Sequence, residues 1–108
     1  MSELEVLRAE FDQRVETLEE VSDALVQLMD RFPLDAQIIR WQFSDAGRLQ
    51  ECGMNHCIRI AENVSKPNTP ENIQIAGYQE IRATYDRMIG LQQRVLQAMR
   101  DLCLGDNN

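Results

Sequence analysis

The feature that most constrains the fold is a repeat of apolar residues along the first 32 positions of the chain. These residues follow one another at steps of three and four, and their mean spacing of about 3.5 residues is the repeat of a coiled-coil seam. One place in the series, position 14, is held by Arg14, with Val15 beside it. The series comprises Leu4, Leu7, Phe11, Leu18, Val21, Leu25, Leu28 and Phe32. We therefore expect one long helix here, around which the rest of the chain is organised.

Local signals place the ends of this first helix at about residues 3–32. Ser2 precedes the first periodic residue and stands three positions before Glu5, the spacing of a capping box. Pro33 cannot continue a helix, because it lacks the backbone N–H and disfavours helical geometry in the residue before it. The short connection that follows predicts an antiparallel second helix, with Asp35 as a candidate N-cap.

The second helix is expected over about residues 35–64, and its apolar pattern is less regular. Gly47 and Gly53 lie inside it, and each glycine costs a helix about 1 kcal/mol relative to alanine. Ser44 and Asp45 are able to cap a restarted helix, so one interpretation is a break or kink near 44–47. The other is close approach of a neighbouring helix at the glycines.

A third helix is expected over about residues 70–104. Thr69 as N-cap and Pro70 at the first helical position form a start signal, and Gly105 is placed for a C-cap. Two adjacent apolar stripes run along this helix, so we expect it to touch two neighbours. The first is Gly77, Ile81, Thr84, Met88, Leu91, Val95, Ala98 and Leu102, and the second is Tyr78, Tyr85, Ile89, Leu96, Met99 and Cys103.

Together these segments predict an all-α protein, an elongated antiparallel three-helix bundle with coiled-coil-like packing. At 108 residues the chain is expected to be one domain over 1–108. A long, thin bundle has a small core for its length, and such bundles often complete their burial against another chain. We therefore expect self-association as a homodimer, or a bundle with an open apolar groove.

The net charge of −7 is concentrated in the first third of the chain. Residues 1–37 hold ten acidic residues and three arginines, whereas residues 38–108 hold eight acidic and eight basic residues. A protein that binds the phosphate backbone needs a basic face, so we expect no direct nucleic-acid binding. Among the acids, Glu16, Glu19 and Asp23 recur at helical spacing, mostly away from the apolar seam. They form either a solvated face or an acidic docking surface.

Three observations bear on the compartment. The chain has no apolar run near the ~20 residues of a membrane span, and its N-terminus is acidic rather than basic. Its three cysteines are an odd number and are spread along the chain, which favours reduced thiols. A cytoplasmic protein without a membrane segment is the resulting expectation.

Candidate chemistry is confined to one short stretch, which holds Cys52, His56 and Cys57. Cys52 and His56 are four positions apart and share a helix face, as two ligands of a metal would. A four-ligand site would need Cys103, which the antiparallel arrangement places about 30 Å away. A nucleophile–base pair lacks an oxyanion donor or a glycine-rich loop. We therefore expect no enzyme activity, no cofactor and no metal, although a two-ligand site shared by two chains stays open.

The sequence favours a non-enzymatic protein–protein interaction module of the adaptor, chaperone or scaffold type, acting by helix packing. The residues that we expect at its interface are Leu18, Leu25, Trp41 and Phe43. Trp41 and Phe43 are equally well explained as core residues at one end of the bundle. The alternative is an acidic inhibitor or decoy, whose first helix presents Glu16, Glu19 and Asp23 to the basic surface of a nucleic-acid-binding protein.

Overall fold

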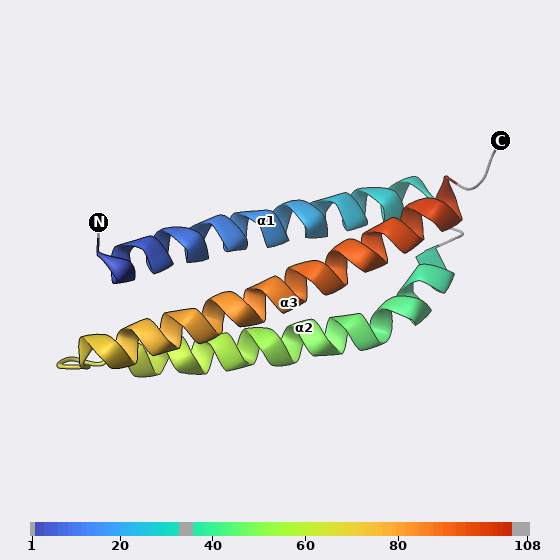
Figure 1. Ribbon diagram of the computed structural model, residues 1–108. Coiled ribbons are helices and arrows are strands. Elements are labelled where there is room, and N and C mark those ends of the chain that lie inside the picture. The colour runs from blue at the N-terminus through green and yellow to red at the C-terminus, as the bar shows by residue number, and fades with distance from the viewer. Residues whose placement is uncertain (1, 33–35, 105–108) are drawn as a thin grey trace.

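The computed structural model describes the backbone of residues 2–32 and 36–104, and the side chains of the same ranges except 36–45. It consists of three helices: α1 (Glu3–Arg31), α2 (Ala36–Val64) and α3 (Glu71–Cys103). α1 and α3 run in the same direction and α2 runs against them (Figure 1). The molecule measures 57 × 26 × 17 Å along its principal axes. The predicted all-α, elongated three-helix bundle is confirmed.

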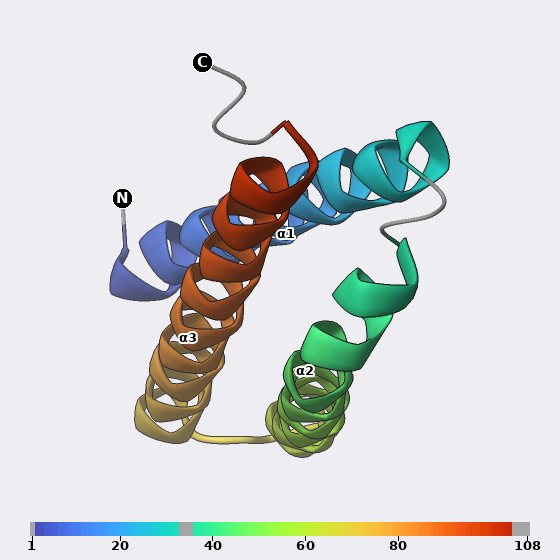
Figure 2. The same ribbon diagram turned by 90° about the vertical axis from the view of Figure 1, so that its right-hand side faces the viewer.

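The central element of the bundle is α3, and not α1 as the regular seam of α1 suggested. α3 packs along α1 on one side and along α2 on the other, whereas α1 and α2 barely touch among the residues that the structure describes (Figures 1 and 2). The two apolar stripes of α3 thus meet two neighbours, as predicted. The described core divides into two clusters along the axis. The first joins all three helices around Leu18, Cys57, Ile81 and Tyr85, and the second joins α1 to α3 around Leu25, Leu96 and Met99.

The polar interruption of the α1 seam has a structural explanation. Arg14 is half-buried, and its Nε donates a hydrogen bond of 2.8 Å to Oδ1 of Asp86 on α3. One turn earlier, Glu10 accepts a hydrogen bond of 2.6 Å from Arg82. The apolar stems of the two arginines cover the core while their charges pair near the surface. These ion pairs fix α1 against α3 in parallel register.

Close approach between α2 and α3 depends on two glycines. A Cβ atom added at Gly77 would lie 2.5 Å from Cγ1 of Val64 and 3.2 Å from Cγ2 of Ile60. A Cβ atom at Gly53 would lie 2.8 Å from Sδ of Met88. Gly47, in contrast, has no described atom within 4 Å of its Cβ position. Close helix approach therefore explains Gly53. α2 is one continuous helix through 44–47, and Figure 1 shows that its axis bends in its N-terminal third.

The helix ends agree with the sequence signals at α1 and differ at α3. Ser2 caps α1, since its side chain accepts a hydrogen bond of 3.2 Å from the backbone N–H of Glu5. At α3 the prediction of Thr69 as N-cap is wrong, because the cap is Pro70 and has no side-chain hydrogen bond. The hydroxyl of Thr69 instead donates to the carbonyl of Lys66 at 2.6 Å, inside the preceding turn. The predicted C-cap Gly105 and N-cap Asp35 lie outside the described residues.

Candidate functional site

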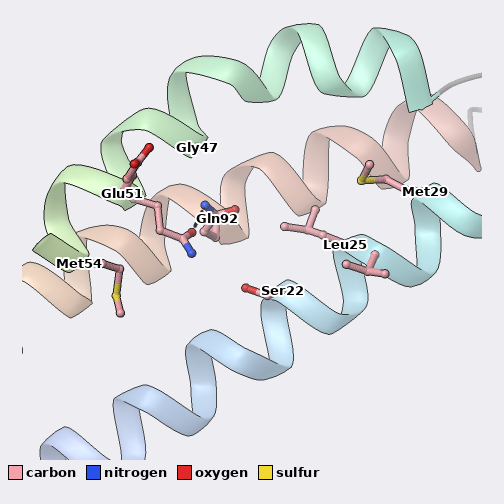
Figure 3. Close-up of a pocket in the computed structure, with 9 residues that line it drawn as sticks. Ser22, Leu25, Met29, Gly47, Glu51, Met54 and Gln92 are labelled. Atoms are coloured by element: carbon pink, nitrogen blue, oxygen red, sulfur yellow. Dashed lines mark hydrogen bonds between the residues drawn. The ribbon is translucent and has the colours of Figure 1, made fainter.

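The open side of the bundle is a concave surface between α1 and α2, with α3 as its floor. Its middle part is a hollow of about 450 Å³ (Figure 3). α1 lines it with Ser22, Leu25, Val26 and Met29, α2 with Gly47, Gln50, Glu51 and Met54, and α3 with Gln92. The exposed lining is mostly apolar. We call this surface the α1–α2 groove.

The groove continues toward the loop between α2 and α3. A second hollow of about 120 Å³ shares Met54 with the first. α1 contributes Phe11 to it, α2 contributes Cys57, Ile58 and Ala61, and α3 contributes Tyr78, Ile81 and Tyr85. The ring of Phe11 meets those of Tyr78 and Tyr85 edge to face, with centroids 6.4 and 5.4 Å apart. The aromatic floor is therefore packed in fixed geometry before any partner binds.

A polar side chain lies at the bottom of this apolar surface. Gln92 is 1% exposed, and its Nε2 donates a hydrogen bond to Oε1 of Gln50 on α2. Its Oε1 is buried and has no hydrogen-bond partner among the described residues. Turning the amide by 180° would exchange the two atoms and still leave one of them unpaired. A buried amide atom without a partner costs free energy, and a ligand in the groove could supply the missing bond.

Each wall of the groove presents an exposed aliphatic residue among carboxylates. Val26 on α1 is 55% exposed and Ile58 on α2 is 50% exposed. The positions three, four and seven residues from Val26 include Glu19, Asp23 and Asp30, which are its neighbours on a helix surface. The same positions around Ile58 include Glu51 and Glu62 and, as around Val26, no lysine or arginine. Around Val26 and Ile58 the rims are therefore apolar with negative flanks, whereas at the second hollow the guanidinium of Arg8 lies over the ring of Tyr78.

The predicted interface residues occupy different places. Leu18 and Leu25 are 6% and 4% exposed and pack inside their own chain, although Leu25 also lines the groove. Trp41 and Phe43 belong to α2 but fall outside the residues whose side chains are described. The structure thus places Leu18 and Leu25 in the core of their own chain. Contact of any of the four residues with a partner stays a prediction.

The predicted acidic residues lie together on the outer side of α1. Glu16, Glu19 and Asp23 are all exposed. No described residue forms an ion pair with any of them. They occupy the side of α1 opposite to Leu18 and Leu25, as their spacing along the helix requires. This surface is available to a basic partner.

The cysteine–histidine stretch does not form one site, because its residues divide between two faces of α2. Cys57 is buried in the core, and burial raises the pKa of its thiol, outweighing the opposing effect of a hydrogen bond with Thr84. Cys52 and His56 are exposed on the other side of α2, in a hollow of about 590 Å³ shared with Arg87 and Arg94. His56 Nε2 lies 3.2 Å from Oε1 of Glu80. Within the described ranges, no three cysteine, histidine or acidic side chains are grouped as metal ligands.

Gln92 was not among the site residues predicted from the sequence, although a signal for it was present. Tyr78, Tyr85 and Met99 on α3 are separated by multiples of seven residues, and Gln92 occupies the heptad position between Tyr85 and Met99. A polar residue at a core position of a heptad is a recognised marker of partner specificity. The pattern of the second stripe of α3 therefore indicated a buried amide.

Comparison of the chain with protein-family models, with curated proteins and with solved structures gives no match. In the part of the chain that the structure describes, no helix is both long and apolar enough to cross a membrane. The geometry of the groove and the exposed charges are therefore the observations from which a function is inferred.

Proposed function

We propose that this chain is a non-enzymatic protein–protein interaction module of the adaptor, chaperone or scaffold type. It acts in the cytosol and binds a partner protein by accepting a helix in the α1–α2 groove. The observation that carries the proposal is the incomplete burial between α1 and α2, two helices that flank α3 but scarcely meet in the described part of the chain. A fourth helix in this position would complete a four-helix arrangement, in which side chains of facing helices interdigitate.

The apolar residues of the groove support this proposal. Val26 and Ile58 lie on opposite walls and are half exposed, while Met29 and Met54 line the hollow between the walls. Methionine side chains are flexible and adapt to different partner surfaces. Burying exposed aliphatic side chains contributes about 25 cal/mol per Å² of apolar area. A helix that covers both walls would therefore gain a favourable free energy of association.

Site-specific photo-crosslinking tests the proposal in cells that express the full chain. A photoreactive amino acid at Val26 or at Ile58 is expected to crosslink the same partner. The matched control is position 6, because Val6 is also an exposed valine of α1 (39% exposed) but does not line the groove. Val26→Asp is expected to abolish the crosslink from position 58, whereas Val6→Asp leaves it intact. Equal crosslinking from all three positions, or from none, contradicts the proposal.

The predicted homodimer stays a separate prediction. Because Leu18 and Leu25 are buried within one chain, a dimer that keeps α1 on α3 has to use other residues. Light scattering behind size exclusion, over a range of concentrations, distinguishes the 12.5 kDa monomer from a particle of twice that mass.

The exposed acidic face of α1 favours the second function, an inhibitor or decoy that binds the basic surface of a nucleic-acid-binding protein. Its support is that Glu16, Glu19 and Asp23 are exposed on one face and form no ion pair with a described residue. Neutralising all three, by changing each glutamate to glutamine and the aspartate to asparagine, is expected to abolish partner binding. Binding by the unchanged protein should weaken steeply with salt. Glu16→Gln alone separates the two functions, because Glu16 lines neither groove hollow: it should weaken a decoy and leave groove binding unchanged.

A further inference from the structure

We propose that the occupant of the α1–α2 groove is a basic amphipathic helix of a partner protein, and that this helix carries a side-chain hydrogen-bond donor that meets Oε1 of Gln92. This inference rests on the proposed function and specifies its partner by chemistry. Three properties of the groove carry it: its length and apolar lining, the unpaired amide at its floor, and the charges along its rims.

The length of the groove suits a helix. The two hollows share Met54, and on α1 they are lined by Phe11 at one end and by Ser22 to Met29 at the other. Phe11 and Met29 are about 27 Å apart at the helical rise of 1.5 Å per residue. A partner helix of about 18 residues spans that distance. Its apolar residues at steps of three and four would lie over Val26, Met29 and Met54 on the walls, and over Ile58 toward the aromatic floor.

At the level of Gln92, the floor of the groove favours a partner helix that carries a polar side chain. Gln92 is 1% exposed, and its Oε1 has no partner in the described part of the chain. Because Oε1 is already shielded from water, an entirely apolar helix would leave it unpaired and would forgo the hydrogen bond that a polar side chain at this level would supply. A helix with an amide or hydroxyl group at the same level would donate to Oε1 and complete the hydrogen bonding that Gln50 begins. The buried amide thereby selects partner and register, as a polar core residue does in a coiled coil.

The rims select the charge of the helix. Val26 is flanked by Glu19, Asp23 and Asp30, and Ile58 by Glu51 and Glu62. Lysine or arginine residues beside the apolar face of the partner helix would lie against these carboxylates, which accelerates association and suppresses acidic competitors. A second copy of this chain is poorly suited, because the outer face of its α1 would bring more carboxylates to the same rims. The favoured occupant is therefore a heterologous basic helix.

The test uses synthetic helical peptides of about 18 residues with a common face of leucine and alanine, binding the full chain in fluorescence anisotropy titrations. One peptide carries lysine on its flanks and a matched peptide carries glutamate. We expect the lysine peptide to bind at least about tenfold more tightly at low salt, and this ratio to shrink at about 0.5 M salt. The Val26→Asp variant is expected to bind the apolar face of the lysine peptide more weakly, whereas Val6→Asp has no effect on peptide binding.

A second arm tests the role of Gln92. In the lysine peptide, one leucine of the apolar face is replaced by glutamine, in turn at each central position. At one position the glutamine peptide is expected to bind about fivefold more tightly than the all-leucine peptide. Gln92→Met removes the unpaired amide and keeps the volume, so this variant is expected to prefer the all-leucine peptide. The reversal of preference is a readout that a merely structural role of Gln92 would not produce.

The outcomes separate this inference from the function on which it rests. If Val26 and Ile58 crosslink a partner but the lysine peptide binds no better than the glutamate peptide, the interaction module stands and the basic helix is wrong. If the reversal at Gln92→Met is absent at every peptide position, the assigned donor is wrong. A dimeric mass that Val26→Asp converts to a monomer would show that a second copy occupies the groove, which overturns the inference. Failure of both crosslinking and peptide binding removes the proposed function too.

Discussion

The amide of Gln92 on α3 donates a hydrogen bond to Oε1 of Gln50 on α2, and this bond joins the floor of the α1–α2 groove to one of its walls. The two residues differ in their surroundings, because Gln92 is 1% exposed and Gln50 is half-buried. Gln50 is able to reach water with its remaining polar atom, whereas Oε1 of Gln92 is left without a partner among the described residues. The pair therefore stabilises α2 against α3 while it keeps an unsatisfied acceptor beneath the groove.

Replacing Gln92 and replacing Gln50 are expected to change the free energy of unfolding in opposite directions. Gln92→Met removes the unpaired buried acceptor and should raise the free energy of unfolding of the isolated chain by about 1 kcal/mol. Gln50→Met leaves both polar atoms of the Gln92 amide unpaired and should lower the free energy of unfolding by about 1–2 kcal/mol. Urea denaturation followed by circular dichroism measures both values. A loss of stability in Gln92→Met would mean that the amide is satisfied in the free protein.

Two glycine-to-alanine changes on α3 are expected to have opposite effects on the stability of the protein. Gly77→Ala places a methyl group 2.5 Å from Cγ1 of Val64, and the resulting overpacking is expected to cost about 1–3 kcal/mol. Gly90→Ala is the matched control on the same helix, because no atom of the described residues lies within 4 Å of its Cβ position. It should stabilise the protein by up to about 1 kcal/mol through helix propensity. Thermal unfolding gives both signs, and stabilisation by Gly77→Ala would contradict the close packing of α2 on α3.

The order of these elements could be predicted because each depends on local pattern. The heptad seam of α1, the Ser2 cap and the stop before Pro33 involve neighbouring residues only, and α1 begins and ends within one residue of the predicted bounds. The two adjacent stripes of α3 predicted that this helix touches two neighbours, and the structure confirms it. The more regular seam of α1 nevertheless suggested α1 as the organising element, because a stripe shows that a helix is buried on one side and not which helix lies at the centre of the bundle.

The candidate site was harder to predict for the same reason. Val26 and Ile58 lie outside the main apolar stripes, and a single exposed aliphatic residue is ordinary on any surface. Their significance depends on the gap between α1 and α2, which is a tertiary feature. At Thr69 a local signal was present but misleading. Thr69 is a favourable capping residue and was predicted to cap α3, but its hydroxyl forms a hydrogen bond inside the preceding turn instead. Capping of α3 and hydrogen bonding inside the turn are both compatible with a threonine at this position, and the sequence alone does not show which one forms.

The ion pair between Arg14 and Asp86 predicts a charge-reversal experiment. Arg14→Glu places two carboxylates together and should destabilise the protein. Adding Asp86→Arg restores opposite charges at the 2.8 Å contact and should recover part of the loss. The coupling is expected to stay below about 1 kcal/mol, because the Asp86 side chain is 55% exposed and solvent screens the pair. A double-mutant cycle by urea denaturation measures it. If Asp86→Arg deepened the loss caused by Arg14→Glu instead of relieving it, the result would argue against the parallel register of α1 and α3.

The buried thiol of Cys57 predicts how stability depends on pH. Burial raises its pKa above the ordinary value of 9.0, with an added effect of the Glu80 carboxylate, while a hydrogen bond with Thr84 and the charge of Arg87 act in the opposite direction. The folded chain therefore holds the thiol proton at pH values where the unfolded chain has lost it. By linkage, this contribution to stability is fully present below pH 9.0 and is lost as the pH rises through the folded-state pKa.

The urea midpoint of the unchanged protein is accordingly expected to fall as the pH rises above 9.0. Burial also raises the pKa of Tyr85 above its ordinary value of 10.0, so a further fall should follow at higher pH. Cys57→Ala is expected to lower the midpoint at every pH, because it leaves a cavity, but to flatten the first part of the decline. Tyr85→Phe is the matched control that flattens only the second part. An unchanged slope in Cys57→Ala would show that the thiol is not shielded from water, and that the second hollow of the groove opens to its depth in solution.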